Sequence, residues 1–260
     1  MQVTLDYTKT VHQNADAYFA AAKKAKKKLE GVNTALSISE KKIAELTKER
    51  DAYALTLEPE EVDIKRKIKW YEQFRWFHAS NGMLAVGGRD ATSNEQVLKS
   101  HVIAHDVVFH TEAPGSPFFV LQTEGKEVHP LVFEEVGQMT AAYSKAWAGG
   151  YTSVEAFYVN PDQVSKHAQS GEYVKKGSFM VRGKKTFVQP RMELYMGLLE
   201  GQIVVGTRQS VKKQTDVFVK LVPGREKSSD IAKQVRKKLD GGNLDEIIRM
   251  IPAGGSRLSK

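Results

Sequence analysis

The chain has 260 residues, no cysteine, and 39 Lys and Arg against 31 Asp and Glu, for a formal net charge of +8. Hydrophobic residues make up 41%, enough to bury a core, so the composition excludes global disorder. The chain also lacks the cysteines of disulfides and thiolate zinc sites, a transmembrane-length apolar run and a signal-peptide pattern, and this predicts a cytoplasmic protein.

The first part of the chain predicts a helical arm. Alternating apolar and polar residues over 3–7 favour a short strand. Apolar residues then recur at helical spacing among Lys and Glu, which predicts one long helix over 14–58, bent near Gly31, and a second helix over 60–73. We expect the two helices to pair as a coiled-coil hairpin, or else to form one arm of a longer stalk.

From Trp76 onward the pattern changes to strands and shorter helices. Asn81-Gly82 predicts a hairpin with a type I′ turn, and Thr92 with Glu95 predicts a capping box for a helix that ends near His101. Further strands are expected over 106–112, 118–123, 154–159, 179–181, 186–188, 194–199, 203–206 and 217–222, and further helices over 131–148, 229–239 and 244–250.

This order of elements predicts an α+β fold, in which a helical arm precedes a mixed, largely antiparallel sheet with helices. It divides the chain into a coiled-coil arm over 1–75 and a second domain over 76–260. We find no internal repeat.

The positive charge gathers in two blocks of the second half. Residues 164–191 carry a net charge of +6 and residues 207–238 carry +7. Clustered Lys and Arg favour a polyanion partner because they displace counterions from phosphates, although a solvated basic surface would look the same. The predicted phosphate contacts are Arg89, Arg182, Lys184, Lys185, Lys212, Lys213, Lys233, Arg236 and Lys237.

Three local patterns select these residues. Arg89 follows Gly87-Gly88, a pair that could let backbone amides approach a phosphate. Residues 182–185 are predicted to form the exposed tip of a hairpin, because an unpaired buried ammonium is costly. On the helix over 229–239 an apolar stripe leaves the basic residues on the opposite face.

Catalytic signatures are weaker. His101 and His105 have the spacing of zinc ligands on a helix, but no H-E-x-x-H motif accompanies them. His110 with Asp106 and Glu112 is a possible hydrolase or nuclease site, whereas no serine-nucleophile or Walker A motif is present. We therefore predict a binding protein without catalytic residues, metal or cofactor.

Several motifs together resemble the NFACT family. They begin with Trp70-Tyr71-Glu72-Gln73-Phe74-Arg75-Trp76-Phe77 and continue through Gly87-Gly88-Arg89-Asp90-Ala91, Asn94-Glu95, Asp106-Val107-Val108-Phe109-His110, Gly115-Ser116-Pro117, Ser170-Gly171-Glu172-Tyr173, Lys176-Gly177-Ser178-Phe179-Met180 and Gly183-Lys184-Lys185. This set, over about 70–190, looks like the RNA-binding NFACT-R module. The helices before it look like the family's coiled-coil middle, and residues 190–255 look like the tail of archaeal members.

The resemblance implies an RNA-binding fragment of a ribosome-associated quality-control factor. Full-length members bind obstructed large ribosomal subunits and recruit tRNA, so the implied partners are tRNA, rRNA and the large subunit, with no membrane. The family's N-terminal module is absent from this sequence and is itself a possible partner. A DNA-binding module is the alternative, because phosphate contacts do not distinguish DNA from RNA.

Overall fold

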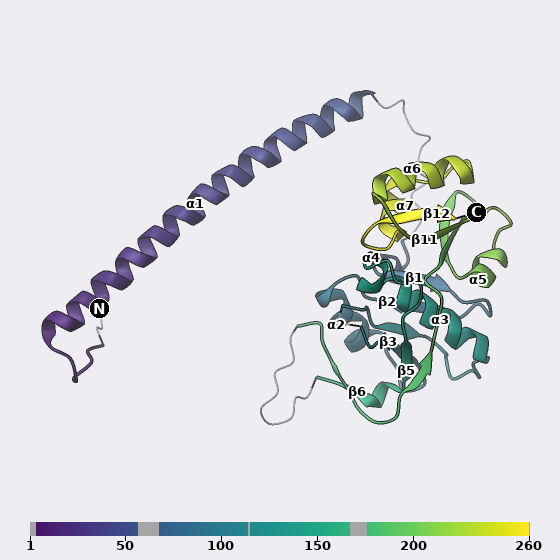
Figure 1. Ribbon diagram of the computed structural model, residues 1–260, viewed down its shortest axis with the longest axis horizontal. Coiled ribbons are helices and arrows are strands. Elements are labelled where there is room, and N and C mark those ends of the chain that lie inside the picture. The colour runs from purple at the N-terminus through teal and green to yellow at the C-terminus, as the bar shows by residue number, and fades with distance from the viewer. Residues whose placement is uncertain (1–3, 57–67, 114, 167–175, 260) are drawn as a thin grey trace. The chain divides into compact units, whose positions relative to one another are not determined.

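The computed structural model describes residues 4–56, 68–113, 115–166 and 176–259 (Figure 1). The chain divides into two compact units, residues 1–67 and 68–260. No helix in the described part of the chain is both long and apolar enough to cross a lipid bilayer.

The first unit consists mainly of one helix, α1 (Val11–Thr56), which is continuous through Gly31 (Figure 1). Its N-terminal end is closed by Asn14, whose side-chain amide donates to the Asp6 carbonyl at 3.0 Å while its side-chain oxygen accepts from the Asp6 amide at 2.9 Å. Residues 4–10 form a loop that precedes α1, and none of them belongs to the strand predicted over 3–7.

The predicted coiled-coil pairing stays a prediction. Apolar side chains of α1 are exposed, among them Leu29 at 61%, Ile43 at 64% and Leu46 at 53%. Most of the predicted partner helix lies at 57–67, outside the described residues. Its described end is instead the 3₁₀ turn η1 (Trp70–Gln73), which packs Tyr71 into the core of the second unit.

The second unit is built on a six-stranded sheet in the order β1-β2-β4-β3-β5-β8, and every pairing in it is antiparallel. Its strands are β1 (Arg75–His78), β2 (Leu84–Gly87), β3 (Val107–Thr111), β4 (Phe119–Leu121), β5 (Ala156–Val159) and β8 (Thr186–Val188).

Both faces of this sheet are buried. Phe119 and Leu121 on β4 belong to the larger core cluster, which includes α3 (Pro130–Ala142), while Val120 between them belongs to the cluster that includes η1 and α2 (Ala91–Ser100). Successive side chains of a strand point to opposite faces, so a continuous apolar run fills two cores. Burying one such side chain contributes roughly 1.5–3 kcal/mol.

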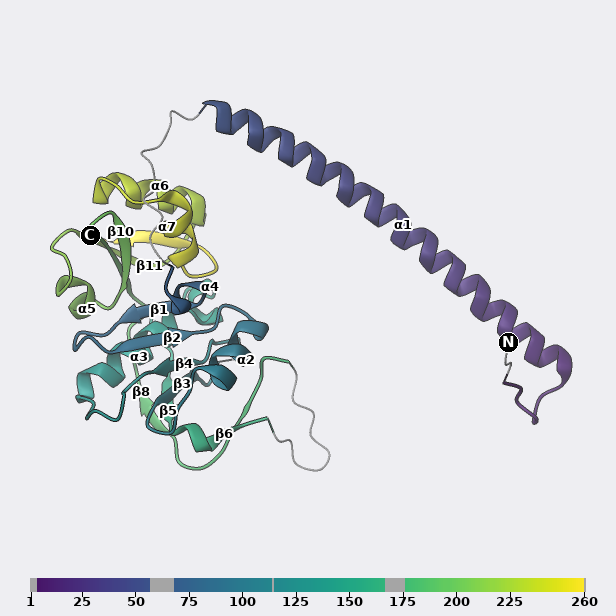
Figure 2. The same ribbon diagram turned by 180° about the vertical axis from the view of Figure 1, so that it is seen from behind.

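A four-stranded antiparallel sheet in the order β10-β9-β11-β12 completes the larger core. It consists of β9 (Leu194–Leu199), β10 (Gln202–Gly206), β11 (Phe218–Glu226) and β12 (Ser256–Ser259). With it lie the helices α5 (Arg208–Lys212), α6 (Ser228–Leu239) and α7 (Leu244–Met250) (Figures 1 and 2). The α+β class and the predominance of antiparallel pairing are confirmed, whereas β12 and α5 were not predicted.

Local sequence signals misplaced three features. The turn after β1 has a positive φ at Gly82 but not at Asn81, so it is not type I′. The cap of α2 is Asp90, which accepts from the Ser93 amide at 2.8 Å, rather than Thr92. The predicted helix over 131–148 is two helices, because Ser144 starts α4 (Lys145–Ala148) by accepting from the Ala146 amide.

The predicted hairpin around 182–185 is wrong. β7 (Met180–Val181) pairs with β6 (Val164–Ser165), which follows the 3₁₀ turn η2 (Pro161–Gln163), while β8 joins the large sheet beside β5. Residues 182–185 therefore connect two sheets. Gln163 holds this connection by donating its side-chain amide to the carbonyls of Arg182 and Lys184.

Candidate nucleic-acid interface

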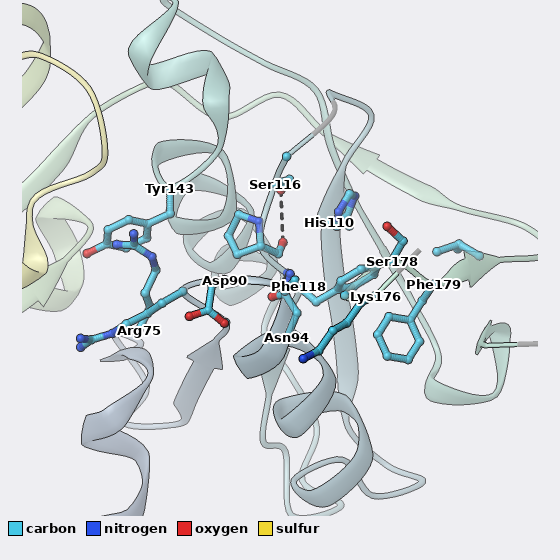
Figure 3. A pocket seen from close by; sticks show the side chains of 17 residues that line it. Arg75, Asp90, Asn94, His110, Ser116, Phe118, Tyr143, Lys176, Ser178 and Phe179 are labelled. Carbon is cyan, nitrogen blue, oxygen red and sulfur yellow. Dashed lines mark hydrogen bonds between the residues drawn. The ribbon is translucent and has the colours of Figure 1, made fainter. Parts of the chain in front are cut away.

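A pocket of about 480 Å³ opens in the second unit where several chain segments meet (Figure 3). Its walls come from the start of β1, the loop between β2 and α2, the end of β3, the loop before β4, the residue after α3, and residues 176–179. Figure 3 shows Arg75 and Tyr143 at one end and Ser178 and Phe179 at the other, with Phe118 between. The pocket thus has a basic end and an aromatic end.

The basic end contains two arginines. The Arg75 guanidinium lies over the Tyr143 ring, 4.0 Å from its centroid, and burial lowers the pKa of Arg75, although arginine stays cationic in proteins. Arg89 donates to the Phe74 carbonyl at 2.9 Å and to the Glu72 carbonyl at 3.4 Å. Burial lowers the pKa of Arg89, and the nearby positive charge of Arg75 lowers it further. The two guanidinium groups are therefore close enough to repel each other.

Part of each guanidinium is buried without an acceptor. Arg75 Nη1 and Arg89 Nε have no hydrogen-bond partner among the described residues, and neither arginine forms an ion pair with them. A buried donor without an acceptor costs about 1–3 kcal/mol. Both nitrogens are closed off from solvent, so this end of the pocket offers an anion the positive charge of the two arginines rather than these two donors.

The backbone of the Gly87-Gly88 loop is already occupied. The Gly88 amide donates to the Phe118 carbonyl at 3.2 Å, and the amides of Arg89 and Asp90 donate to Ser93 Oγ at 2.8 and 2.9 Å. A Cβ at Gly88 would overlap the side-chain oxygen of Asn94. The glycine is thus required for packing against α2, and these amides do not form the phosphate cradle that the sequence suggested.

The aromatic end holds Phe118 and Phe179, whose centroids lie 5.6 Å apart in an edge-to-face arrangement. His110 lies against Phe118 at 4.2 Å, and its Nδ1 is 2.6 Å from the Thr111 carbonyl. Burial lowers the pKa of His110. An uncharged imidazole therefore lines the apolar part of this pocket at neutral pH.

The catalytic alternative does not assemble. Asp106 precedes β3 and accepts from the backbone amides of Ile103 and Thr123, whereas His110 lies near the other end of the strand, about 13 Å away at 3.3 Å per residue. Glu112 pairs with Lys185 at 2.7 Å. The predicted hydrolase or nuclease site of His110, Asp106 and Glu112 is therefore not formed.

The two histidines spaced as zinc ligands do not share a helix, because α2 ends at Ser100. His101 stacks on Trp70 with a centroid distance of 4.1 Å and follows the end of α2. Among the residues that the structure describes, no group of three or more His, Asp or Glu side chains is arranged to hold a metal ion.

Glu95 on α2 binds Gly177, in the stretch 176–179 that lines the pocket, and also Lys166. Its carboxylate forms an ion pair with Lys166 and accepts from the Gly177 amide at 3.0 Å. The hydrogen bond to Lys166, followed by that from Gly177, lowers the pKa of Glu95 to about 2. Glu95 thus fixes where residues 176–179 meet the pocket, a role that its predicted place in a capping box did not reveal.

The basic connection over 182–185 is only partly available to a phosphate. Lys184 is exposed, as predicted. The Lys185 ammonium, by contrast, lies 2.7 Å from the Glu112 carboxylate and 4.4 Å from the centroid of Phe157, and its side chain is 28% exposed. The prediction that both lysines project into solvent is wrong for Lys185, because two partners on neighbouring strands hold it.

The basic face of α6 has the predicted exposure. Ile231, Val235 and Leu239 are buried, which leaves the other side of the helix in solvent. The basic residues exposed on α6 and at the end of α5 are Lys233, Arg236, Lys237, Lys212 and Lys213.

The predicted contacts do not form one cluster. Arg89 lines the pocket, whereas α6 and the small sheet that carries β6 lie at opposite ends of the second unit (Figures 1 and 2). Four further residues line the same pocket as Arg89 but were not among the predicted contacts: Arg75, Phe118, Tyr143 and Lys176. Arg75 and Lys176 each lie in a motif that resembles the NFACT family, and these motifs were the only sequence signal that could have pointed to them. No local sequence pattern indicated that the two motifs lie side by side in the fold.

Comparison with known proteins decides the family. Residues 73–183 match the family model described as "NFACT protein RNA binding domain". The chain belongs to the NFACT family. An "Archaeal Rqc2 homolog aRqcH" from Methanocaldococcus jannaschii is 35% identical over 204 residues, which is 76% of this chain and 30% of the relative. A "Ribosome quality control complex subunit NEMF homolog" from Drosophila melanogaster is 36% identical over 201 residues, 75% of this chain and 20% of that protein.

The NFACT chain described here therefore spans less than a third of the length of these curated relatives. Among solved structures, the C-terminal region of the fibronectin/fibrinogen-binding protein from Streptococcus suis aligns with a TM-score of 0.40 and 16% identity, covering 78% of this chain and 80% of that one. At that TM-score the alignment adds nothing to the family assignment.

Proposed function

We propose that this chain is an RNA-binding part of a ribosome-associated quality-control factor that acts on obstructed large ribosomal subunits in the cytoplasm. The observation that carries the proposal is the match of residues 73–183 to an RNA-binding domain of the family, together with 35% identity to an archaeal Rqc2 homologue. Residues 68–260 would bind tRNA or rRNA, and the long helix of the first unit would belong to a coiled-coil arm. The chain would bind rather than catalyse.

The surface chemistry supports binding through phosphates. Lys184, Lys212, Lys213, Lys233 and Lys237 are exposed, and their distribution over separate parts of the second unit suits an extended RNA surface better than one short strand. Such contacts position a protein on RNA without reading its sequence. Arg182 and Arg236 are exposed as well and belong to the same proposed set.

The test is binding of the chain to tRNA and to purified large ribosomal subunits, measured at several salt concentrations. If about five phosphates are neutralised, log K falls against log salt with a slope of roughly −3.5 to −4.5. A flat salt response, or failure to sediment with large subunits at low salt, would refute the proposal. DNA of the same sequence and length serves as the comparison, and tighter binding of DNA than of RNA would favour the DNA-binding alternative.

A further inference from the structure

The pocket beside α2 has a composition that general phosphate attraction does not explain. Arg75, Arg89 and Lys176 contribute three cations to its lining, against the single carboxylate of Asp90. That carboxylate is engaged as the cap of α2, where it accepts from the Ser93 amide. The lining is thus net positive, and Figure 3 shows that Lys176 lies beside Phe118 and Phe179 while Arg75 lies at the other end.

The other end is formed mainly by two aromatic rings. Phe118 and Phe179 line it together with Pro117 and Val181. Phe118 is 3% exposed, whereas Phe179 and the neighbouring His110 are half-buried. A fixed anion site at one end and an apolar, aromatic end at the other match the two halves of a nucleotide. A volume of about 480 Å³ is within the range of small-molecule sites, which is roughly 300–1,000 Å³.

We propose that this pocket receives one unpaired nucleotide of a bound RNA, with its phosphate at Arg75 and Arg89, its base against the partly exposed ring of Phe179, and Lys176 beside it. The proposal rests on the proposed RNA-binding function and adds a specific subsite to it. The phosphate would balance the net positive charge of the lining. A base in a duplex is not free to enter, so the site would prefer single-stranded or looped RNA.

Four probes test the pocket in the full 260-residue chain: adenosine monophosphate, adenosine, inorganic phosphate and a short single-stranded RNA. Binding is followed by amide chemical shifts at Gly88, Gly177 and Phe179. The expected result is that the monophosphate perturbs these amides and competes with the RNA, while adenosine and phosphate each bind more weakly. Equal affinity for phosphate and the monophosphate would overturn the proposal, because the aromatic end would then contribute nothing.

Two variants address the two ends separately. Lys176→Ala removes an exposed cation, and Phe179→Ala removes a stacking surface, with an expected loss of RNA affinity of about 5- to 150-fold for the ring. Phe179→Leu keeps the apolar bulk and should recover folding but not stacking. Lys126→Ala and Tyr151→Ala are the matched controls, since both residues are exposed and outside the pocket.

The outcomes separate the subsite from the function. If the RNA binds all pocket variants like the unmodified chain, and the monophosphate leaves the three amides unperturbed, the subsite is refuted while RNA binding stands. If no RNA binds the unmodified chain at any salt concentration, the proposed function fails, and the monophosphate titration still decides whether the pocket takes a nucleotide.

Discussion

Two basic regions of the second unit hold their cations in different ways. α6 carries Lys233 and Lys237 on an exposed face, because its opposite face packs into the core. In the connection over 182–185, the Lys185 ammonium is held by the Glu112 carboxylate and lies over an aromatic ring. The lysines of α6 can displace counterions from an approaching phosphate, whereas a phosphate approaching Lys185 competes with a carboxylate.

Equal formal charge therefore does not mean equal availability. The entropy of counterions released from the RNA drives phosphate binding, and a lysine already paired with a carboxylate is less available to neutralise a phosphate and release them. We expect α6 to contribute more to RNA affinity and to its salt dependence than the connection does. The following experiments test that difference.

Reversing two charges on α6 should have the largest effect. The double variant Lys233→Glu, Lys237→Glu should weaken RNA binding by about tenfold or more, because two phosphate contacts are lost. The slope of log K against log salt should become shallower by about 1.4–1.8, which is the contribution of two contacts. Fluorescence anisotropy at three salt concentrations measures both. Lys126→Glu is the control for a reversed exposed charge, and an unchanged slope in the double variant would place the RNA-binding face away from α6.

Removing both lysines of the connection should have a smaller effect. Lys184→Ala with Lys185→Ala should reduce the salt slope by about 0.7–0.9, the contribution of one phosphate contact, because Lys185 is already paired with Glu112. The same anisotropy titration decides the point. A reduction as large as that of the α6 variant would mean that Lys185 leaves its carboxylate readily, and the contrast between the two regions would disappear.

Releasing Lys185 should strengthen binding. Glu112→Gln removes the competing carboxylate, so we expect RNA affinity to rise by about two- to fivefold at low salt, within the range of a partly exposed ion pair. Glu127→Gln makes the same charge change at an exposed site and serves as the control. A gain of the same size in both variants would indicate a general effect of net charge.

For folding stability we expect the reverse order: Lys185 in the connection over 182–185 should contribute more than the exposed lysines of α6. Lys185→Ala removes an ion pair and a cation–π contact, and should lower the free energy of unfolding by about 0.5–1 kcal/mol. Lys237→Ala on α6 should change it by less than about 0.5 kcal/mol. Urea unfolding of the second unit, followed by the fluorescence of its three tryptophans, measures both. Equal losses would contradict the structural difference.

Lowering the pH should loosen residues 176–179, which line the pocket, before it loosens α6. The folded-state pKa of Glu95 is lowered to about 2, so its stabilising contribution is complete above its ordinary value of 4.5 and is lost as the pH falls from there toward 2. Amide hydrogen exchange at Gly177 should increase in that window while exchange in α6 does not. Glu95→Gln should show the faster exchange already at pH 6, and unchanged exchange would refute the anchoring role.

Periodicity explains which of these features were predictable. The buried stripe of α6 is a local pattern, because residues three and four apart share one face of any helix, and the structure confirms it. The antiparallel α+β class followed from the order of strands and helices in the same way. The exposure of Lys185 could not be predicted, since Glu112 lies 73 residues away and joins it only through strand pairing.

The sequence by itself determined the family, the fold class, the long helix and the basic face of α6, because each depends on motifs or periodicities within short segments. The tertiary structure alone decided the strand order, the pairing of Lys185 with Glu112, and the pocket that brings Arg75 and Lys176 together. Those outcomes depend on which distant segments pair in the two sheets. Such pairing is set by the burial of two sheet faces at once, and no single segment encodes it.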